Sequence, residues 1–383
     1  AGGVVAPPDP GRPPHGSLVR IAGDHPLPAD GSLRASEAVA AALSRIDPKD
    51  ELWVLLSGGA TSLIGAPVAG LSDLEYRQLV AAVSRSGLPI GDLNRIRKRF
   101  SRWGAGRMAT AARAGRIRVF ALSDVPGDDP ADIGSGPCEP DISTAAGILA
   151  LLDSLPNRDE VPLVAFRWLE RVIRGDLPET PKPHDGRFAT VTTRIVGSNA
   201  LAREAAAARA KVLGYEVHTI EGMITGDAAA AAARLVADTA GPVTTATAWI
   251  AGGETTVRLG PDHGRGGRCQ ELALAGAREL AEHDTGPTAL LAGGTDGRDG
   301  PTDAAGAVVD NASWASLKAR GIDPERALRD HDAYPALAAI GALLRPGLTE
   351  TNVMDLMIVL REPARVTAEA SPSETGSRDP RSP

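Results

Sequence analysis

Residues 288–310 read TALLAGGTDGRDGPTDAAGAVVD, and this stretch decides how the rest of the chain is interpreted. Its opening, Thr288 to Ala292, is a short apolar run of the kind that forms a buried strand. Glycines directly after a strand let backbone N–H groups approach a ligand and form a concavity for oxygen anions. Asp296, Asp299 and Asp303 follow, and carboxylates are the ligands that Mg²⁺ prefers. We therefore predict a ligand site at the carboxyl end of a sheet strand. A surface loop is the alternative, because Asp-Gly is a common turn dipeptide.

The composition limits the class of protein. A chain of 383 residues suits two domains, and 43% hydrophobic residues are enough for a full core. A net charge of −7 disfavours nucleic acid as a partner, although it allows a small anionic ligand. Two cysteines, no CxxC or HExxH motif and no apolar run of membrane-spanning length argue against a disulfide scaffold, a zinc site and a membrane protein. We expect a cytoplasmic protein.

Two further loops follow predicted strands in the first half of the chain. The strand Glu51–Leu56 leads into Ser57-Gly-Gly-Ala-Thr-Ser62, a layout that holds phosphate or carboxylate oxygens with backbone N–H groups. A purely structural turn is an equally good interpretation of that loop. The strand Arg116–Leu122 leads into an acidic, glycine-punctuated loop, and Asp124 lies directly at the strand end, where catalytic or metal-holding carboxylates occur.

Positive charge is concentrated in residues 94–107, which read NRIRKRFSRWGAGR. Such a run is typical of a solvated helix face, and an anion-facing turn is the competing interpretation. Lys98, Arg102 and Arg107 are the candidates for anion contacts. A third glycine-rich loop, Gly264–Arg268, opens a predicted helix, so that Gly266, Gly267 and Arg268 would form an anion site at a helix N-terminus. His25, in a turn between Asp24 and Pro26, is interpreted as structural.

Strands and helices alternate along the whole chain, which predicts an α/β fold in two domains. A proline-rich segment between residues 154 and 187 marks the boundary, so the domains are expected at residues 1–186 and 187–361. The polar, Pro- and Ser-rich residues 362–383 are expected to be a disordered tail. Helices are predicted from Ser32 to Ile46, Ser72 to Arg85, Asn199 to Val212, Leu272 to His283 and Asn311 to Arg320. Later strands are predicted at Thr190–Val196, Thr255–Leu259 and Asn352–Leu360.

Several of these stretches together resemble the glycerate 2-kinase family, whose second half is known as the MOFRL domain. The resemblance rests on motifs in the family's order: Gly23-Asp-His-Pro-Leu-Pro28, Leu56-Ser-Gly-Gly, Ser123-Asp-Val-Pro-Gly-Asp-Asp with Gly134-Ser-Gly-Pro, Gly252-Gly-Glu-Thr-Thr, Gly264-Arg-Gly-Gly-Arg with Gln270-Glu, and Gly294-Thr-Asp-Gly through Asp310. They extend from about residue 18 to residue 360.

The resemblance implies a kinase that uses ATP and Mg²⁺ to phosphorylate the 2-hydroxyl of glycerate. It also implies two three-layer α/β/α domains, the first Rossmann-like with a mainly parallel sheet and the second with a mixed sheet, and an active site in the cleft between them. The residues assigned to chemistry are Asp124, Lys98, Arg268 and Asp296. Those assigned to Mg²⁺ are Asp124, Asp296 and Asp299. Those assigned to ligand binding are Ser57, Gly58, Gly59, Thr61, Ser62, Arg102, Gly266, Gly267, Gly294, Thr295 and Asn352.

The chain departs from the family pattern at a few positions. Ala60, Gly104, Cys269 and Glu350 stand where relatives have glycine, lysine, asparagine and a glycine-threonine loop, respectively. A further strand–helix unit with a Gly-Lys-Ala turn is expected to be absent. Two alternatives therefore stay open: a kinase homologue that only binds nucleotide or hydroxyacid, and an NAD(P)-dependent hydroxypyruvate reductase, which lacks support because no GxGxxG fingerprint follows a strand. A homodimer is also left open.

Overall fold

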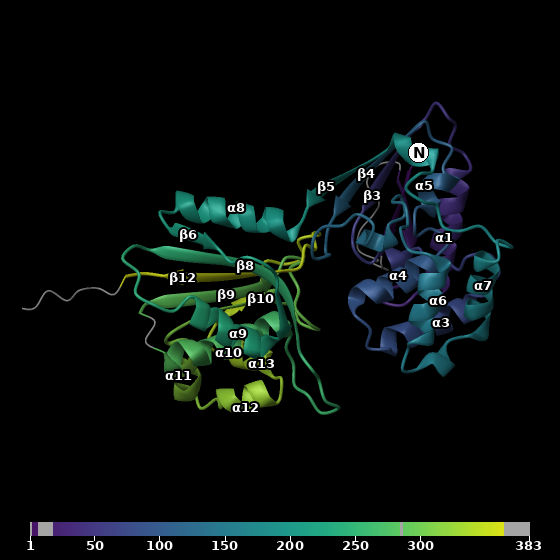
Figure 1. Ribbon diagram of the computed structural model, residues 1–383. Coiled ribbons are helices and arrows are strands. Elements are labelled where there is room, and N and C mark those ends of the chain that lie inside the picture. The colour runs from purple at the N-terminus through teal and green to yellow at the C-terminus, as the bar shows by residue number, and fades with distance from the viewer. Residues whose placement is uncertain (1, 7–17, 284–285, 364–383) are drawn as a thin grey trace, which may run out of the picture.

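The computed structural model describes residues 2–6, 18–283 and 286–363, and the chain forms two parts (Figure 1). The expected tail lies, from residue 364 on, outside the described residues. The two-part α/β architecture, with parallel pairing in the first part and a mixed sheet in the second, is confirmed.

The first part contains two parallel sheets. In one, β1 (Gly2–Ala6) pairs with β2 (Leu18–Ala22). In the other, β4 (Arg116–Leu122) lies between β3 (Glu51–Leu56) and β5 (Val191–Gly197). Because β5 belongs to this sheet, the boundary expected after residue 186 falls before the last strand of the first part.

Two cores support the first part. Alternate residues of β4, among them Ile117 and Val119, pack against α1 (Asp30–Leu43) and α5 (Arg107–Ala111). A separate helical core joins α3 (Asp73–Arg85), α4 (Ile90–Phe100), α6 (Ala145–Asp153) and α7 (Leu163–Ile173). Short helices α2 (Ala60–Leu63), η1 (Ile133–Ser135), η2 (Arg158–Glu160) and η3 (Gly186–Thr190) complete this part.

One face of the three-stranded sheet remains open in the part of the chain that the structure describes. Trp53 and Leu55 of β3 are 62% and 77% exposed, whereas the alternating Leu52 and Val54 pack on the core. Helices therefore cover only one face of this sheet among the described residues, which differs from the three layers expected for the first part.

The second part is built on a seven-stranded mixed sheet in the order β11-β10-β9-β12-β8-β6, with β7 also paired to β8. Central strand β12 is antiparallel to β8 on one side and to β9 on the other. The strands are β6 (Glu216–Thr219), β7 (Ile224–Asp227), β8 (Thr247–Thr256), β9 (Thr288–Gly294), β10 (Gly306–Asp310), β11 (Leu343–Leu344) and β12 (Asp355–Arg361).

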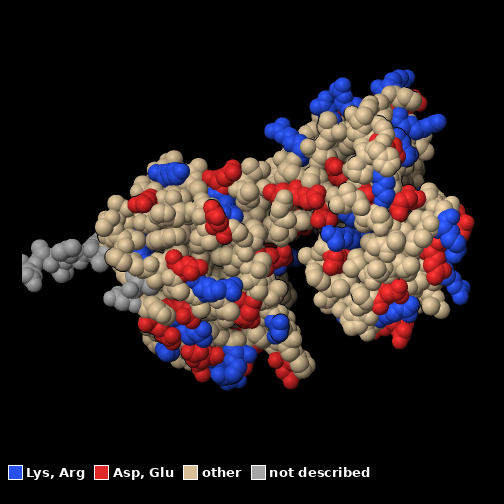
Figure 2. Space-filling model, viewed as in Figure 1, with Lys and Arg blue, Asp and Glu red and all other residues tan. Residues whose placement is uncertain are grey.

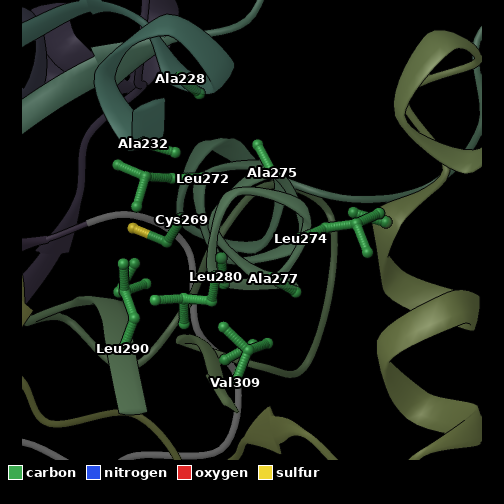
Figure 3. Close-up of a cluster of buried hydrophobic side chains, with 14 of the residues drawn as sticks. Ala228, Ala232, Cys269, Leu272, Leu274, Ala275, Ala277, Leu280, Leu290 and Val309 are labelled. Atoms are coloured by element: carbon green, nitrogen blue, oxygen red, sulfur yellow. The ribbon is translucent and has the colours of Figure 1, made fainter. Parts of the chain in front are cut away.

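Helices cover both faces of this sheet, as expected (Figure 1). The helix α8 (Asn199–Val212) packs on Ile250 of β8 and Ile358 of β12. The opposite face, carrying Met357 and Val359, packs on α9 (Ala228–Asp238) and α10 (Arg268–Glu282). Figure 3 shows the α10 side chains against Leu290 and Val309 of β9 and β10. The remaining helices are α11 (Ser313–Ala319), α12 (Pro324–Arg329) and α13 (Ala333–Ala339).

Several predicted element bounds need correction. The expected strand Thr255–Leu259 is not separate, because β8 runs unbroken from Thr247 to Thr256. The first helix begins at Asp30 rather than after a Ser32 cap, since the Ser32 hydroxyl accepts the backbone N–H of Asp24 from inside the helix. The helix α10 begins at Arg268, not Leu272, because a carboxylate from another loop caps its start.

Candidate functional site

In the first part of the molecule, the candidate site is built on the loop Ser57–Gly59. A Cβ on Gly58 would overlap the carboxylate of Asp124, so that only glycine lets this side chain lie on the loop. A Cβ on Gly59 would lie 3.1 Å from the His25 ring, and Gly59 has a φ of 79°, which also favours glycine. One loop therefore carries a carboxylate and an imidazole on adjacent glycines.

Asp124 is held at the end of β4. The preceding residue, Ser123, donates its backbone N–H to Gly197 at the end of β5, which fixes the chain where Asp124 leaves the sheet. Burial raises the pKa of Asp124, while its own backbone N–H and the charge of His25 act in the opposite direction. The structure thus places Asp124 where the sequence predicts it, at the end of a strand and beside a glycine loop.

Two loop hydroxyls assigned to ligand binding have structural partners. The Thr61 and Ser135 hydroxyl oxygens are 2.7 Å apart, and Ser62 donates to the Pro26 carbonyl at 2.6 Å. These contacts connect the glycine loop to the acidic loop after β4 and to the turn that carries His25.

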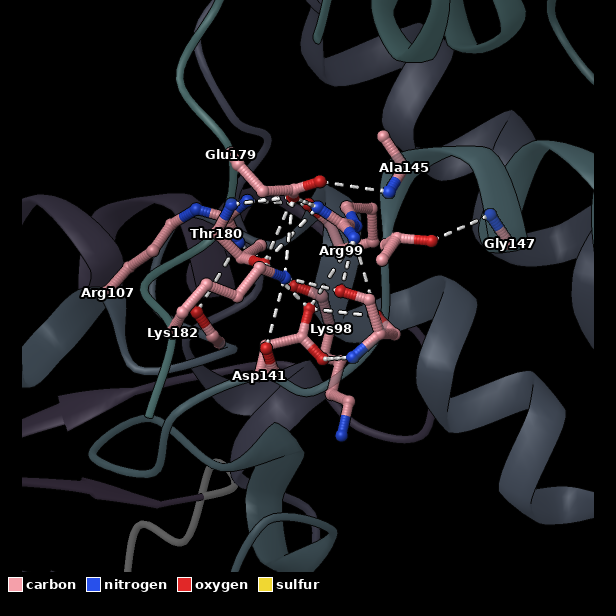
Figure 4. A network of polar contacts seen from close by, with 12 residues as sticks. Lys98, Arg99, Arg107, Asp141, Ala145, Gly147, Glu179, Thr180 and Lys182 are labelled. Carbon is pink, nitrogen blue, oxygen red and sulfur yellow. Dashed lines mark hydrogen bonds and ion pairs between the residues drawn. The ribbon is translucent and has the colours of Figure 1, made fainter. Parts of the chain in front are cut away.

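The basic run is not a solvated helix face (Figure 4). Arg99 is fully buried, forms ion pairs with Asp141 and Glu179, and donates to the Ser143 carbonyl. The guanidinium of Arg107 donates to the carbonyls of Lys98, Arg99, Ser101 and Gly104 at the end of α4. Arg107 therefore holds a helix end together and has its donors directed at backbone rather than at an anion.

Lys98 and Arg102 point to different places. Lys98 is 5% exposed, and its Nζ donates to the Ala131 carbonyl at 3.3 Å and lies 3.6 Å from Asp132 in the acidic loop. Arg102 pairs with Glu37 and lies over the Trp103 ring. Lys98 thus braces the loop that follows Asp124, while Arg102 forms a surface ion pair.

The second part contributes Arg268, at the start of α10, between two carboxylates. Its guanidinium binds Asp355 in bidentate fashion, with Nε and Nη2 at 2.7 and 3.0 Å from the two oxygens. Its Nη1 lies 2.7 Å from Glu254. Burial opposes its charge, yet the hydrogen bonds and charges of Asp355 and Glu254 raise the pKa of Arg268. This is a preorganised cation.

Asp355 opens the central strand β12 and is 1% exposed. The Asn199 side chain, from the start of α8, donates to the carbonyls of Val353 and Asp355 at 3.0 and 2.9 Å. Asp355 lies inside the strand predicted at Asn352–Leu360, where the sequence assigns it no role. An acidic residue inside an apolar strand was the available signal, because a buried charge requires a partner.

Asp299 does not act as predicted. Its carboxylate accepts the backbone N–H groups of Cys269 and Gln270, and thereby occupies the N-terminus of α10. A Cβ on Gly267 would overlap the same carboxylate. Burial outweighs these donors and raises the pKa of Asp299 to about 6. The predicted anion site at Gly266, Gly267 and the helix start is therefore filled by the protein's own carboxylate, and Asp299 is not free to bind a metal ion.

The loop after β9 divides between structure and site. Thr295 has a structural role: its hydroxyl donates to the Met354 carbonyl and accepts the Val353 N–H, which joins this loop to the residues just before β12. Asn352 caps its own turn by accepting the Met354 N–H. Asp296 accepts the Arg298 N–H, and a Cβ on Gly294 would lie 3.1 Å from Asp296 and 3.5 Å from Asp355. Asp296 and Gly294 thus lie next to the Arg268–Asp355 pair.

The two halves of the site face each other. Burial raises the pKa of Glu254, and the charges of Asp355 and of Asp124, which belongs to the other part, add to this rise although Arg268 opposes it. Figure 2 shows a deep notch between the two parts, with acidic side chains gathered where they join. Asp124, Gly58 and Gly59 from one part and Arg268, Glu254, Asp355 and Asp296 from the other form the candidate site.

Comparisons with known proteins identify the family. A model described as a domain of unknown function (DUF4147) matches residues 1–170, and the MOFRL family model matches residues 247–355. The chain is 32% identical to a glycerate 2-kinase of Pyrococcus horikoshii, over 89% of this chain and 77% of that protein. It is 35% identical to the D-glycerate 2-kinase of Thermotoga maritima, over 88% and 78%. This chain belongs to the glycerate kinase family.

A solved structure agrees with this assignment. The crystal structure of a glycerate kinase from Thermotoga maritima superimposes with a TM-score of 0.83 at 34% identity, covering 94% of this chain and 84% of that one. Among the described residues, no helix is long and apolar enough to cross a membrane.

In this chain, a member of the glycerate kinase family, the predicted Mg²⁺ ligands do not come together. No three His, Cys, Asp or Glu side chains of the described residues are arranged to hold a metal ion. A magnesium ion that arrives with a nucleotide needs only one or two protein carboxylates, because phosphates and water supply the rest. Asp124 and Asp296 fit that requirement, since neither carboxylate forms a salt bridge with a side chain of the described residues.

Proposed function

We propose that this protein transfers the γ-phosphoryl group of ATP to the 2-hydroxyl of glycerate, giving 2-phosphoglycerate and ADP. One observation carries the proposal. Asp124 lies on a glycine loop of the first part and faces, across the junction, Arg268 of the second part, which two carboxylates hold in place. Phosphoryl transfer requires mainly positioning and neutralisation of charge. Asp124 supports the first need and Arg268 the second. The identity of the acceptor, glycerate, is inferred from the family to which the chain belongs.

Asp124 is proposed to orient the acceptor. A hydroxyl that donates to this carboxylate would lie directly above Gly58, where no side chain intervenes. The raised pKa of Asp124 improves it as a proton acceptor, because a carboxylate with a higher pKa holds a proton more firmly.

Arg268 is proposed to meet the transferred phosphoryl group. Its two bonds to Asp355 fix the plane of the guanidinium, whereas Glu254, whose side chain is 47% exposed, makes a single contact. A phosphate oxygen can replace Glu254 without disturbing the buried pair. Such preorganised charge acts on the transition state at little reorganisation cost.

Mg²⁺ bound with ATP would neutralise phosphate charge, and Asp124 and Asp296 are the residues proposed to hold it. The protein's own contribution is to keep these carboxylates on glycine-lined backbone. The free, buried Cys138 and Cys269 are consistent with a reducing compartment, so we place the enzyme in the cytoplasm.

The test is an ADP-release assay with ATP, Mg²⁺ and D-glycerate, with the product identified by ³¹P NMR. We expect 2-phosphoglycerate. A 3-phosphate product would overturn the assigned hydroxyl. ATP binding without turnover would replace the kinase with a nucleotide-binding homologue. Oxidation of NADH or NADPH by hydroxypyruvate, followed at 340 nm in a parallel sample, would instead favour the reductase.

A further inference from the structure

His25 was interpreted as a structural turn residue, but its surroundings do not support that role. The side chain is exposed, its ring nitrogens form no hydrogen bond with any residue that the structure describes, and its charge interacts with that of Asp124. A structural histidine is expected to use at least one ring nitrogen to bond its neighbours. His25 instead presents an imidazole to solvent beside the candidate site.

The turn that carries His25 is nevertheless held on both sides. The Asp24 carboxylate accepts the Ser32 N–H at 3.0 Å, while the Ser32 hydroxyl accepts the Asp24 N–H at 3.1 Å. On the other side, Ser62 donates to the Pro26 carbonyl. The imidazole is therefore exposed and yet attached to backbone fixed at the residues before and after it.

Three glycines let this turn lie directly on the glycine loop. A Cβ on Gly23 would overlap the backbone of Leu63, one on Gly65 would lie 2.7 Å from Pro28, and one on Gly59 would lie 3.2 Å from Nε2 of His25. The ring thus rests on Gly59, one residue away from the glycine that carries Asp124. Groups preorganised in this way are typical of a binding site.

We propose that His25 binds the acceptor: the imidazole donates a hydrogen bond to a carboxylate oxygen of glycerate while the 2-hydroxyl donates to Asp124. This inference rests on the proposed function for the identity of the acceptor. It adds a residue that none of the site assignments above includes.

The charges around His25 favour glycerate over the nucleotide. Asp24 precedes it in the chain, Asp124 lies on the neighbouring glycine, and Glu254, in the second part, is close enough for its charge to interact with that of Asp124. A triphosphate bound at the imidazole ring itself would bring several negative charges to these three carboxylates, and the Mg²⁺ proposed at Asp124 and Asp296 would offset them only in part. A glycerate ion carries one, and the imidazole N–H is a side-chain donor available to it beside this loop.

The kinetic test compares His25→Gln and His25→Ala with wild type. We expect KM for glycerate to rise at least tenfold in both variants and KM for ATP to stay within twofold. His184→Gln, which replaces an exposed histidine beside Asp185, is the matched control and should leave both constants unchanged. A rise in KM for ATP alone, or an unchanged KM for glycerate, would overturn the proposal.

A second measurement does not depend on turnover. The ¹³Cε1–¹H signals of the histidine rings are recorded during titration with D-glycerate alone and with a non-hydrolysable ATP analogue alone, and the His25 signal is assigned by its absence in His25→Gln. A shift with glycerate supports the proposal even if no phosphoryl transfer occurs, in which case only the proposed function fails. A shift with the ATP analogue alone, or with neither ligand, overturns it.

Discussion

Arg268 depends on two carboxylates that differ in burial. Asp355 is almost fully buried and bidentate, while Glu254 is half exposed and makes one contact. Residue identity matters here more than charge alone, because a planar guanidinium has the forked donors that both carboxylates require, and an ammonium does not.

Replacing Arg268 by lysine should therefore separate geometry from charge. We expect kcat/KM of Arg268→Lys to fall more than tenfold, equivalent to about 1.4 kcal/mol of transition-state stabilisation. Asp355 keeps a cationic neighbour, so the fold should persist. Steady-state kinetics on Arg268→Lys and on the control Arg278→Lys, which lies further along α10, test this. Equal rates in the two variants would remove Arg268 from the chemistry.

Asp299 makes a different prediction, about stability. Its pKa is raised to about 6, so the folded chain retains this proton at pH values where the unfolded chain has lost it. The contribution of Asp299 to folding is therefore fully present below about pH 4 and is lost as pH rises through about 6. Relative to Asp299→Asn, the unfolding free energy of wild type should fall by about 1 kcal/mol between pH 5 and pH 7. Urea unfolding at both pH values measures this; an opposite slope would mean that the helix N-terminus dominates.

At the scale of elements, the loop after β3 needs glycine at position 58 because the Asp124 side chain packs on it, and not because of the loop's own turn geometry. Gly58→Ala would place a methyl group in the volume of the Asp124 carboxylate. We expect kcat to fall more than tenfold with little change in melting temperature, because the carboxylate can turn toward the junction between the two parts.

Gly91 provides the matched control for this substitution. It lies in α4, and an added Cβ would meet nothing within 4 Å. Gly91→Ala should leave kcat unchanged and stabilise the protein by up to about 1 kcal/mol, through helix propensity. Steady-state kinetics and thermal unfolding of both variants decide the matter: full activity in Gly58→Ala would show that Asp124 need not lie on the loop.

Some elements were predictable from the sequence and others were not. The strands Glu51–Leu56 and Arg116–Leu122 were predicted with their observed ends, because each is a short apolar run bounded by turn residues. The direction of Arg99 and Arg107 was not, since a charge run has the same pattern whether its partners are water or buried carboxylates and carbonyls. Asp299 and Asp355 were misjudged for a related reason: their partners lie 29 and 87 residues away in the chain.

The molecule as a whole has separate hydrophobic cores in its two parts. Among the residues that the structure describes, the cores around α3–α7 and β3–β5 have no buried residue in common with those on either face of the seven-stranded sheet. The chain passes from β5 into α8 through Ser198, which caps that helix by accepting the Leu201 N–H. The two parts are thus linked covalently by a short connection.

Separate cores predict separate unfolding transitions. Leu169→Ala in α7 and Leu272→Ala in α10 each remove a fully buried side chain and should each cost about 2–5 kcal/mol. In differential scanning calorimetry, each substitution is expected to lower only the transition of its own part. A single transition that both substitutions shift equally would show that the parts unfold as one unit.

The row of the central sheet that contains Asp355 limits how this protein can acquire new specificities. Asp355 is flanked in register by Gly253 on β8 and Gly294 on β9. A side chain on Gly253 would strike the backbone of Ile224, and one on Gly294 would approach the Arg298 carbonyl at 2.8 Å. Selection for a smaller or differently shaped substrate therefore cannot act by enlarging these two positions. Evolutionary change in substrate range has to come from the surrounding loops, and directed libraries should leave this row constant.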